Sequence, residues 1–287
     1  MTRAIRFTRT GGPEVLELEE VVLPELKAGE ALVRHHAIGV NFIDTYHRSG
    51  LYPLPLPSGL GSEAAGVVEQ IGPGVTCIRV GERVAYAGAG APAAYAEARV
   101  VPAERLVPLP DDISDDVAAA ALLKGMTAEF LIHRTFPVAA GQTVLFHAAA
   151  GGVGLIACQW LNKLGARVIG SVGSDAKREL ALAHGCQEVI VLDRENFPER
   201  VRDLTDGHGV PVVFDSIGKV TFMGSLSCLE PRGMLVSFGN ASGKPEPFDL
   251  ALLAQKGSLY VTRPTLFSYV ATREALLASQ PAFSSHS

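Results

Sequence analysis

Cysteine and long apolar runs are scarce in this chain, and it has no excess of positive charge. The four cysteines among its 287 residues stand singly at Cys77, Cys158, Cys186 and Cys228, which argues against a disulfide framework and favours a reducing compartment. No apolar run reaches the roughly 18 residues that a membrane span needs. With 25 basic and 30 acidic residues, a net charge of −5 and no basic run, the chain lacks the positive patch expected of a nucleic-acid-binding protein. The N-terminus shows no signal-peptide pattern, so we expect a cytoplasmic protein.

The most informative motif is a glycine-rich turn at residues 147–154. It follows the apolar run 143–146, which is typical of a short buried strand, and precedes apolar residues at helical spacing. Glycines let the backbone turn sharply and approach a ligand, and the free N–H groups of a helix N-terminus attract the negative charge of a pyrophosphate. In this context the motif predicts nucleotide binding. The residues expected around the phosphates are Ala150, Gly151, Gly152 and Val153.

The end of the next predicted strand, residues 167–172, indicates which nucleotide binds. An NAD site places an Asp or Glu there against the ribose hydroxyls, whereas this chain continues with Gly173 and Ser174. These small residues leave room for an additional phosphate, and Lys177 is placed to pair with it. In the alternative interpretation, Lys177 and Arg178 belong only to a solvated helix face. Because the acid is missing, we favour NADP over NAD.

The pattern of predicted strands, turns and helices changes near residue 122, which indicates two domains. Residues 1–122 contain short alternating runs separated by glycine and proline turns, which predicts a small, mostly antiparallel β domain. Residues 123–264 alternate strands with helices, which predicts an α/β fold with a doubly wound parallel sheet. The strands are expected at 143–148, 167–172, 188–192, 211–215, 233–238 and 258–262, and the helices at 152–164, 175–184, 197–205 and 221–229. Asp215, at a strand end, is expected to be a turn or helix-cap residue.

Several motifs resemble one family. They are residues 39–46, 48–53 and 57–66 in the first domain, and 146–160, 236–240 and 257–264 in the second. Together they resemble the zeta-crystallin-like NADPH:quinone oxidoreductases, a zinc-less branch of the medium-chain dehydrogenase/reductase superfamily. The resemblance implies a GroES-like catalytic domain, a Rossmann-type NADPH-binding domain, and nicotinamide stacked on quinone in the cleft between them. It also implies a homodimer paired through the edge strand near 258–262.

The residues at the positions expected for metal ligands indicate that no zinc ion binds there. Zinc-dependent relatives hold their catalytic metal with a cysteine and a histidine, and the matching positions here are Asn41 and Ser62. Neither is a competent ligand in a site built from Cys, His and carboxylate. Glu63 alone does not make a site. We therefore expect no bound metal.

The resemblance also implies roles for individual residues. Asn41, Tyr46 and Tyr52 are the candidates for donating hydrogen bonds to a quinone oxygen. In the alternative interpretation, Asn41 only caps the loop backbone, and the two tyrosines are packing aromatics. The further cofactor contacts implied by the match are Asn41, Asp44, Thr127, Phe238, Gly239, Asn240 and Arg263. Arg263 could instead serve strand pairing near a subunit interface.

Two other functions are also consistent with the sequence. A reductase of enone or enal double bonds would act on similar flat, conjugated acceptors, and a non-catalytic NADPH-binding protein would need no substrate at all.

Residues 265–287 are expected to form a return segment to the catalytic domain, with Thr272 capping a helix that cannot pass Pro281. The ending resembles nothing in the family, so we expect a truncated return segment, weak NADPH binding, aggregation and low turnover.

Overall fold

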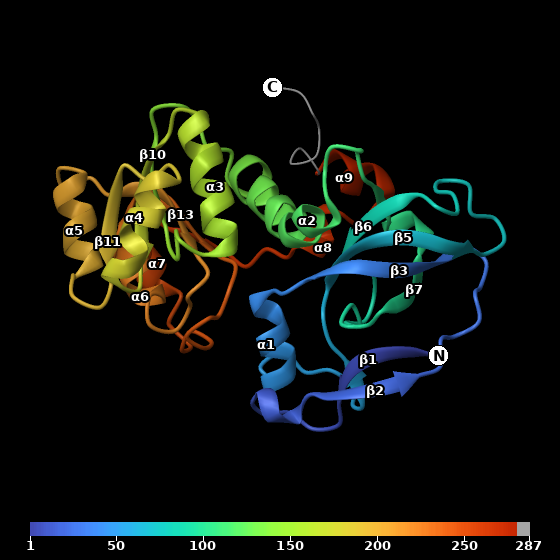
Figure 1. Cartoon of the computed structure of the whole chain (residues 1–287). Helices are drawn as coiled ribbons and strands as arrows, with labels where there is room; N and C mark the ends of the chain where they lie inside the picture. Colours follow the sequence, from blue (N-terminus) through green and yellow to red (C-terminus); the bar gives the residue numbers. More distant parts are fainter. Residues whose placement is uncertain (280–287) are drawn as a thin grey trace. The chain divides into compact units, whose positions relative to one another are not determined.

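The computed structural model describes residues 1–279, which fall into two units. The first unit joins residues 1–126 with 270–279, and the second comprises residues 127–269. The helices and strands carry the labels of Figure 1. Pro281 and the ending that the sequence marks as unusual lie outside the described residues.

The first unit is built on two antiparallel sheets. A five-stranded sheet has the order β7-β3-β5-β6-β8, and a three-stranded sheet has the order β2-β1-β4. Alternating apolar residues of β3, β5 and β6, including Val33, Val68 and Val84, form a fully buried core together with Tyr86 and Leu106. The strands are β1 Thr2–Phe7, β2 Glu17–Val21, β3 Glu30–Gly39, β4 Ser58–Gly59, β5 Glu63–Ile71, β6 Arg83–Ala87, β7 Ala98–Pro102 and β8 Val107–Pro108. The helices are η1 Pro13–Val15, α1 Phe42–Ser49, η2 Ala103–Arg105, α2 Asp115–Glu129, which continues into the second unit, and α9 Arg273–Ala278.

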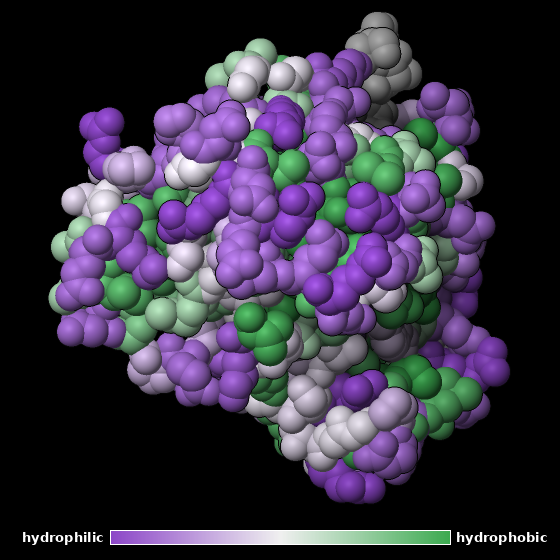
Figure 2. All heavy atoms as spheres, turned by 90° about the vertical axis from the view of Figure 1, so that its left-hand side faces the viewer, coloured by the Kyte–Doolittle hydropathy of each residue, from purple (hydrophilic) through white to green (hydrophobic). Residues whose placement is uncertain are grey.

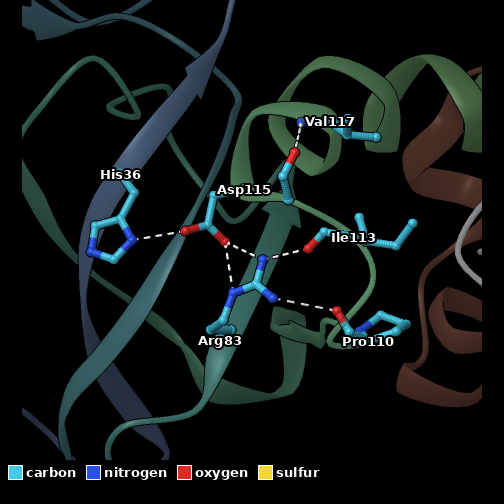
Figure 3. Close-up of polar contacts among 7 residues, drawn as sticks. His36, Arg83, Pro110, Ile113, Asp115 and Val117 are labelled. Atoms are coloured by element: carbon cyan, nitrogen blue, oxygen red, sulfur yellow. Dashed lines mark hydrogen bonds and ion pairs between the residues drawn. The ribbon is translucent and has the colours of Figure 1, made fainter.

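An ionic clamp fixes the start of α2 against the five-stranded sheet (Figure 3). The guanidinium of Arg83 on β6 donates to Asp115 Oδ1 at 2.8 and 3.1 Å and to the carbonyl oxygens of Pro110 and Ile113. The other carboxylate oxygen of Asp115 lies 2.8 Å from Nδ1 of His36 on β3. These partners hold the pKa of Asp115 below its ordinary value against the effect of burial. The clamp therefore sets the position at which α2 begins.

The helix near the end of the described chain packs on the first unit. Thr272 caps α9 as expected, with its Oγ1 accepting from the Ala275 N–H at 3.2 Å. Arg273 donates to the carbonyl oxygens of Glu104 and Leu106 at 2.9 and 3.0 Å. These bonds tie α9 to η2, more than 160 residues earlier in the chain. The predicted N-cap is confirmed.

The second unit is a parallel sheet of six strands in the order β11-β10-β9-β12-β13-β14. Counted along the chain this is the order 3-2-1-4-5-6 of a dinucleotide-binding Rossmann fold, so the expected fold class is confirmed. The strands are β9 Thr143–Phe146, β10 Arg167–Val172, β11 Glu188–Val191, β12 Val210–Asp215, β13 Leu229–Ser237 and β14 Tyr260–Thr262. The helices are η3 Phe130–Thr135, α3 Gly152–Lys163, η4 Asp175–Lys177, α4 Arg178–Ala183, α5 Phe197–Leu204, α6 Phe222–Ser227, α7 Ala251–Gln255 and α8 Leu266–Tyr269.

Several predicted element ends in the second unit are wrong. The strand expected at 258–262 begins only at Tyr260, because Ser258 has a positive φ of 59° that an extended strand does not accommodate. The strand expected at 233–238 begins four residues earlier, at Leu229, and the strand expected at 143–148 ends at Phe146. The helix expected at 175–184 begins as a 3₁₀ turn and becomes α-helical only at Arg178. These differences concern element ends, where local backbone geometry decides.

Helices cover the parallel sheet and present polar side chains to water. Side chains of α5, α6 and α7 share one apolar cluster with the strands, including Val201, Leu226 and Leu252 around Val213 and Leu235. Helices α3 and α4 pack against β10 and β11 (Figure 1). On the face seen in Figure 2, hydrophobic side chains lie in small groups among hydrophilic ones. Among the helices of residues 1–279, none combines the length and apolarity required to cross a bilayer.

Candidate functional site

The glycine-rich turn forms a cradle at the carboxyl end of β9. Ala148 adopts a positive φ of 53°, Gly151 is the N-cap residue, and α3 starts at Gly152. A Cβ on Gly154 would lie 2.4 Å from the Ala148 carbonyl oxygen, so a larger residue does not fit there. The first N–H groups of a helix have no partner within the helix. The structure thus gathers Ala150, Gly151, Gly152 and Val153 at a helix N-terminus, where the Gly151 N–H donates to the Ala148 carbonyl oxygen at 2.8 Å and the first N–H groups of α3 face outward from the helix end.

Directly beneath this cradle lies a buried polar network that the sequence analysis missed. His147 follows β9 and is fully buried. Its Nδ1 lies 2.7 Å from Ser171 Oγ on β10, and its Nε2 lies 3.0 Å from Ser225 Oγ on α6. Burial lowers the pKa of His147, against the opposing effect of the Asp215 charge. The sequence signal for this network was the position of His147 between an apolar strand and a glycine-rich turn.

Asp215 completes the network at the end of β12. One carboxylate oxygen accepts from the N–H groups of Ile217 and Gly218 at 2.8 and 3.1 Å and from Thr221 Oγ1 at 2.9 Å. The other accepts from Ser225 Oγ at 2.9 Å. The expectation that Asp215 shapes a turn at a strand end is confirmed. Since β9 and β12 flank the point where the strand order reverses, the network supports the place where such sheets bind ligands.

The end of β10 is open and carries a cation. Gly173 is exposed, and a Cβ placed there would meet nothing within 4 Å. Ser174 precedes the 3₁₀ turn that ends at the exposed Lys177. Asp175, the first carboxylate after the strand, forms an ion pair with Arg194 at 2.7 Å. Its charge is therefore partly compensated, which leaves the strand end suited to an anion.

A shallow groove follows the end of β13. It has a volume of about 520 Å³, and Ser237, Asn240, Lys244 and Arg263 are among its lining residues. Arg263 donates to the carbonyl oxygens of Ser237 and Gly239 at 2.9 and 3.1 Å. Arg263 therefore fixes the backbone of the segment that includes Phe238. Thr127, the remaining predicted contact of this unit, lies in the last turns of α2.

In the first unit, the start of α1 carries two of the predicted residues. Asn41 is the N-cap residue and is 6% exposed, and its side-chain Nδ2 donates to Glu63 Oε2 at 2.8 Å. Asp44 is 3% exposed, and its Oδ2 accepts from the Asn41 N–H at 2.9 Å and from Tyr95 Oη at 2.8 Å. Within residues 1–279 the Asp44 Oδ1 is buried and has no hydrogen-bond partner. An acceptor left in this way calls for a donor from a ligand or from water.

Glu63 connects α1 to α2 through a fully buried carboxylate. Its Oε1 accepts from the Leu123 N–H at 2.6 Å, and its Oε2 lies 3.5 Å from the Lys124 ammonium. Burial raises the pKa of Glu63, while Lys124 and the hydrogen bond from Asn41 oppose the rise. The sequence analysis had set Glu63 aside and had not considered Lys124. A glutamate at the start of an otherwise apolar strand was the signal for a partner elsewhere in the chain.

The two predicted tyrosines pack against each other beside α1. The ring centroids of Tyr46 and Tyr52 are 4.9 Å apart, and Phe42 lies against Tyr46 at 5.4 Å. Tyr46 is buried, at 8% exposed, and Tyr52 is half-buried. The structure therefore brings both residues to the end of the first unit that holds Asn41 and Asp44.

Residues 1–279 contain no group of three or more His, Cys, Asp or Glu side chains placed to hold a metal. At the positions that match zinc ligands in relatives, Asn41 bonds to Glu63 and Ser62 is buried at 6% exposed. Neither side chain is a typical ligand of zinc.

Comparisons with known proteins agree with a dinucleotide-binding unit joined to an antiparallel β unit. Family profiles described as "Zinc-binding dehydrogenase" and "Alcohol dehydrogenase GroES-like domain" match residues 152–276 and 27–111. A quinone oxidoreductase from Pseudomonas aeruginosa is 55% identical over 279 residues, which are 97% of this chain and 86% of that protein. A 2-haloacrylate reductase from Burkholderia sp is 46% identical over 96% of this chain and 85% of its own length. The crystal structure of Escherichia coli quinone oxidoreductase complexed with NADPH has a TM-score of 0.95 and 48% identity, covering 98% of this chain and 86% of that one. With such identity over nearly its whole length, the chain belongs to the quinone oxidoreductase family of the medium-chain dehydrogenase/reductase superfamily.

Proposed function

We propose that this chain is an oxidoreductase that reduces quinones with NADPH and without a bound zinc ion. The observation that carries the proposal is the end of β10. There, Gly173 and Ser174 stand in place of the acid of an NAD site, and Lys177 offers a cation to the additional phosphate of NADPH. The quinone oxidoreductase from Pseudomonas aeruginosa and the NADPH complex from Escherichia coli support the choice of substrate and cofactor.

The residues present fit this cofactor. The cradle before α3 supplies N–H donors for a pyrophosphate, and the unpartnered Asp44 Oδ1 is an acceptor for the hydroxyl or carboxamide groups of a dinucleotide. Asn41, Thr127, Phe238, Gly239, Asn240 and Arg263 are proposed to complete the contacts. When bound, NADPH supplies the hydride that reduces the substrate.

The chain's own contribution is to orient a flat acceptor and to donate hydrogen bonds to its oxygen. An amide carries two N–H donors, of which Asn41 uses one for Glu63. The second N–H, together with the hydroxyls of Tyr46 and Tyr52, is proposed to bind a quinone oxygen while the ring stacks on the nicotinamide. A phenol at neutral pH is a hydrogen-bond donor rather than a fast acid.

Zinc independence has its own test. The replacement of metal ligands by Asn41 and Ser62 supports it, although one matching family profile is described as zinc-binding. Dialysis against a strong chelator should leave quinone reduction and the melting temperature unchanged. Stoichiometric zinc in an elemental analysis of the active protein would refute this part of the proposal.

A second candidate is reduction of an activated C=C bond. The 46% identity to a protein named 2-haloacrylate reductase favours it specifically. The absorbance of NADPH, followed with a quinone, with an enone, with 2-chloroacrylate and with no acceptor, separates the alternatives. Quinone-dependent oxidation that greatly exceeds the other rates is expected. Oxidation with the C=C substrates alone would favour the second candidate, and none with any acceptor would indicate a binding protein.

We also propose that the chain forms a homodimer. Strand β14 lies at the edge of the parallel sheet, and Tyr260 on it is 58% exposed. An exposed edge strand tends to pair with another chain, and a two-fold axis would join two such edges.

A further inference from the structure

The ammonium of Lys124 in the first unit lies beside the buried carboxylate of Glu63. Its Nζ lies 3.5 Å from Glu63 Oε2, and Glu63 is 0% exposed whereas the Lys124 side chain is 18% exposed. The lysine thus extends from the surface to a buried anion. An ammonium has three N–H donors, and within residues 1–279 Glu63 is its ion-pair partner.

The position of this cation is fixed on more than one side. Glu63 is itself anchored by the Asn41 amide and by the Leu123 N–H. Burial raises the pKa of Asp44, and the charge of Lys124 is among the effects that oppose this rise. The ammonium therefore forms an ion pair with one buried carboxylate and acts electrostatically on a second. A charge held in this way needs little reorganisation when a second negative charge develops beside it.

The surroundings of Lys124 contain polar groups that suit a ligand. The same cluster contains the unpartnered Asp44 Oδ1, a buried acceptor that calls for a donor from outside the described residues. Asn41 shares the Glu63 oxygen with Lys124 and has a second amide N–H besides the one that it donates to Glu63. A fixed cation therefore lies beside further hydrogen-bonding groups.

We propose that the Lys124 ammonium stabilises the negative charge that a quinone oxygen acquires during reduction. This rests on the proposed quinone reduction. The hydride brings two electrons and turns the quinone into a hydroquinone monoanion, and a proton from water completes the product. Glu63 is a positioning residue that acts through Lys124 and Asn41.

Kinetics of three variants test the proposal. Lys124→Met should lower kcat for quinone reduction roughly 100-fold, as removal of one donor to a developing oxyanion does, with little change in the KM for NADPH. Lys124→Arg, which keeps the charge, should recover most of the loss. Lys27→Met is the matched control, because Lys27 is exposed in the same unit and its side chain forms no ion pair within residues 1–279. Unchanged kcat in Lys124→Met beside an active wild type would overturn the inference and leave the proposed function standing.

Lys124→Met leaves Glu63 buried and uncompensated, which destabilises folding. The double variant Glu63→Gln/Lys124→Met removes both charges, so it separates loss of the cation from loss of the fold. It should melt closer to the wild type and still lose the same factor in kcat. Recovery of turnover in the double variant would show that Lys124 merely neutralises Glu63, which contradicts the proposal.

A binding measurement needs no cofactor and no turnover. 4-Nitrophenol becomes yellow when its oxygen is ionised, and it is a ring of quinone size with one phenolic oxygen. Bound to the wild type, its apparent pKa should fall by about one unit or more, as expected beside a fixed opposite charge. In Lys124→Met the fall should disappear. Equal shifts in both proteins, or none in the wild type, would overturn the inference. Absence of quinone turnover in the wild type would instead refute the proposed function.

Discussion

Replacing Asp215 by alanine is expected to destabilise the second unit by about 2–4 kcal/mol. The Gly218 N–H is buried and would lose its acceptor, which costs about 1–3 kcal/mol. The Ile217 N–H is only partly buried, so water can replace its lost bond and the cost lies near the lower end of that range. The two hydroxyls add little, because Thr221 Oγ1 also lies 3.3 Å from the Gly218 carbonyl oxygen and Ser225 Oγ lies 3.0 Å from His147 Nε2.

The chain carries its own reporter for this measurement. Its one tryptophan, Trp160, lies in α3 of the second unit. Urea unfolding followed by tryptophan fluorescence therefore reads the stability of the unit that contains Asp215. The midpoint should fall while the slope stays the same, as expected when stability changes without a change in the exposed surface.

Asp215→Asn is the matched control. Its amide oxygen can still accept from both backbone N–H groups, so it should be less destabilising than alanine, although bonds to a neutral acceptor are weaker. A free energy of unfolding for Asp215→Ala within about 1 kcal/mol of the wild type would refute the reasoning, since this is the lower limit for a single buried donor left without a partner.

Three further predictions follow from the structure. Lys177→Ala should weaken NADPH binding roughly tenfold or more, because a hydrogen bond to a charged group contributes about 1.5–3 kcal/mol, while NADH binding, titrated by nicotinamide fluorescence, should scarcely change. Equal loss of both cofactors would show that Lys177 does not contact the additional phosphate. Burial lowers the pKa of His35 from 6.5 to about 4, so its neutral ring contributes stability above pH 6.5 that is lost as the pH falls towards 4. His35→Gln should make the melting temperature less sensitive to pH in that window, and an unchanged pH dependence would contradict the assignment. Finally, light scattering should give the mass of a dimer at micromolar concentration, and Tyr260→Glu on the edge strand should shift it towards the monomer; a monomeric wild type would exclude pairing through β14.

Local features of the second unit could be predicted from the sequence. A strand, a glycine turn and a helix that follow one another in the chain form the cradle, because its φ values and free N–H groups depend on neighbouring residues alone. The roles of Asp215 and Thr272 were predictable for the same reason, since a cap or turn bonds to residues a few positions away. The parallel sheet also follows from the regular alternation of strands and helices, whereas the order of its strands was found only in the structure.

The element ends were less accessible, as Ser258 illustrates. Its residue type permits a strand, and only its left-handed backbone conformation shows that β14 begins two positions later. Such a conformation is imposed by the surrounding packing rather than by the residue itself.

Hydrogen bonds between residues far apart in the chain could be found only in the tertiary structure. His147 bonds to Ser225 across 78 residues, and Glu63 bonds to Leu123 across 60. No spacing rule connects such pairs, because their distance depends on how strands and helices pack and not on their separation along the chain. The sequence by itself determined the family, the cradle and the absence of typical zinc ligands at the matching positions. Only the packed fold joined Asn41, Glu63 and Lys124 into one charged cluster, since burying a carboxylate requires partners that the fold must bring to it.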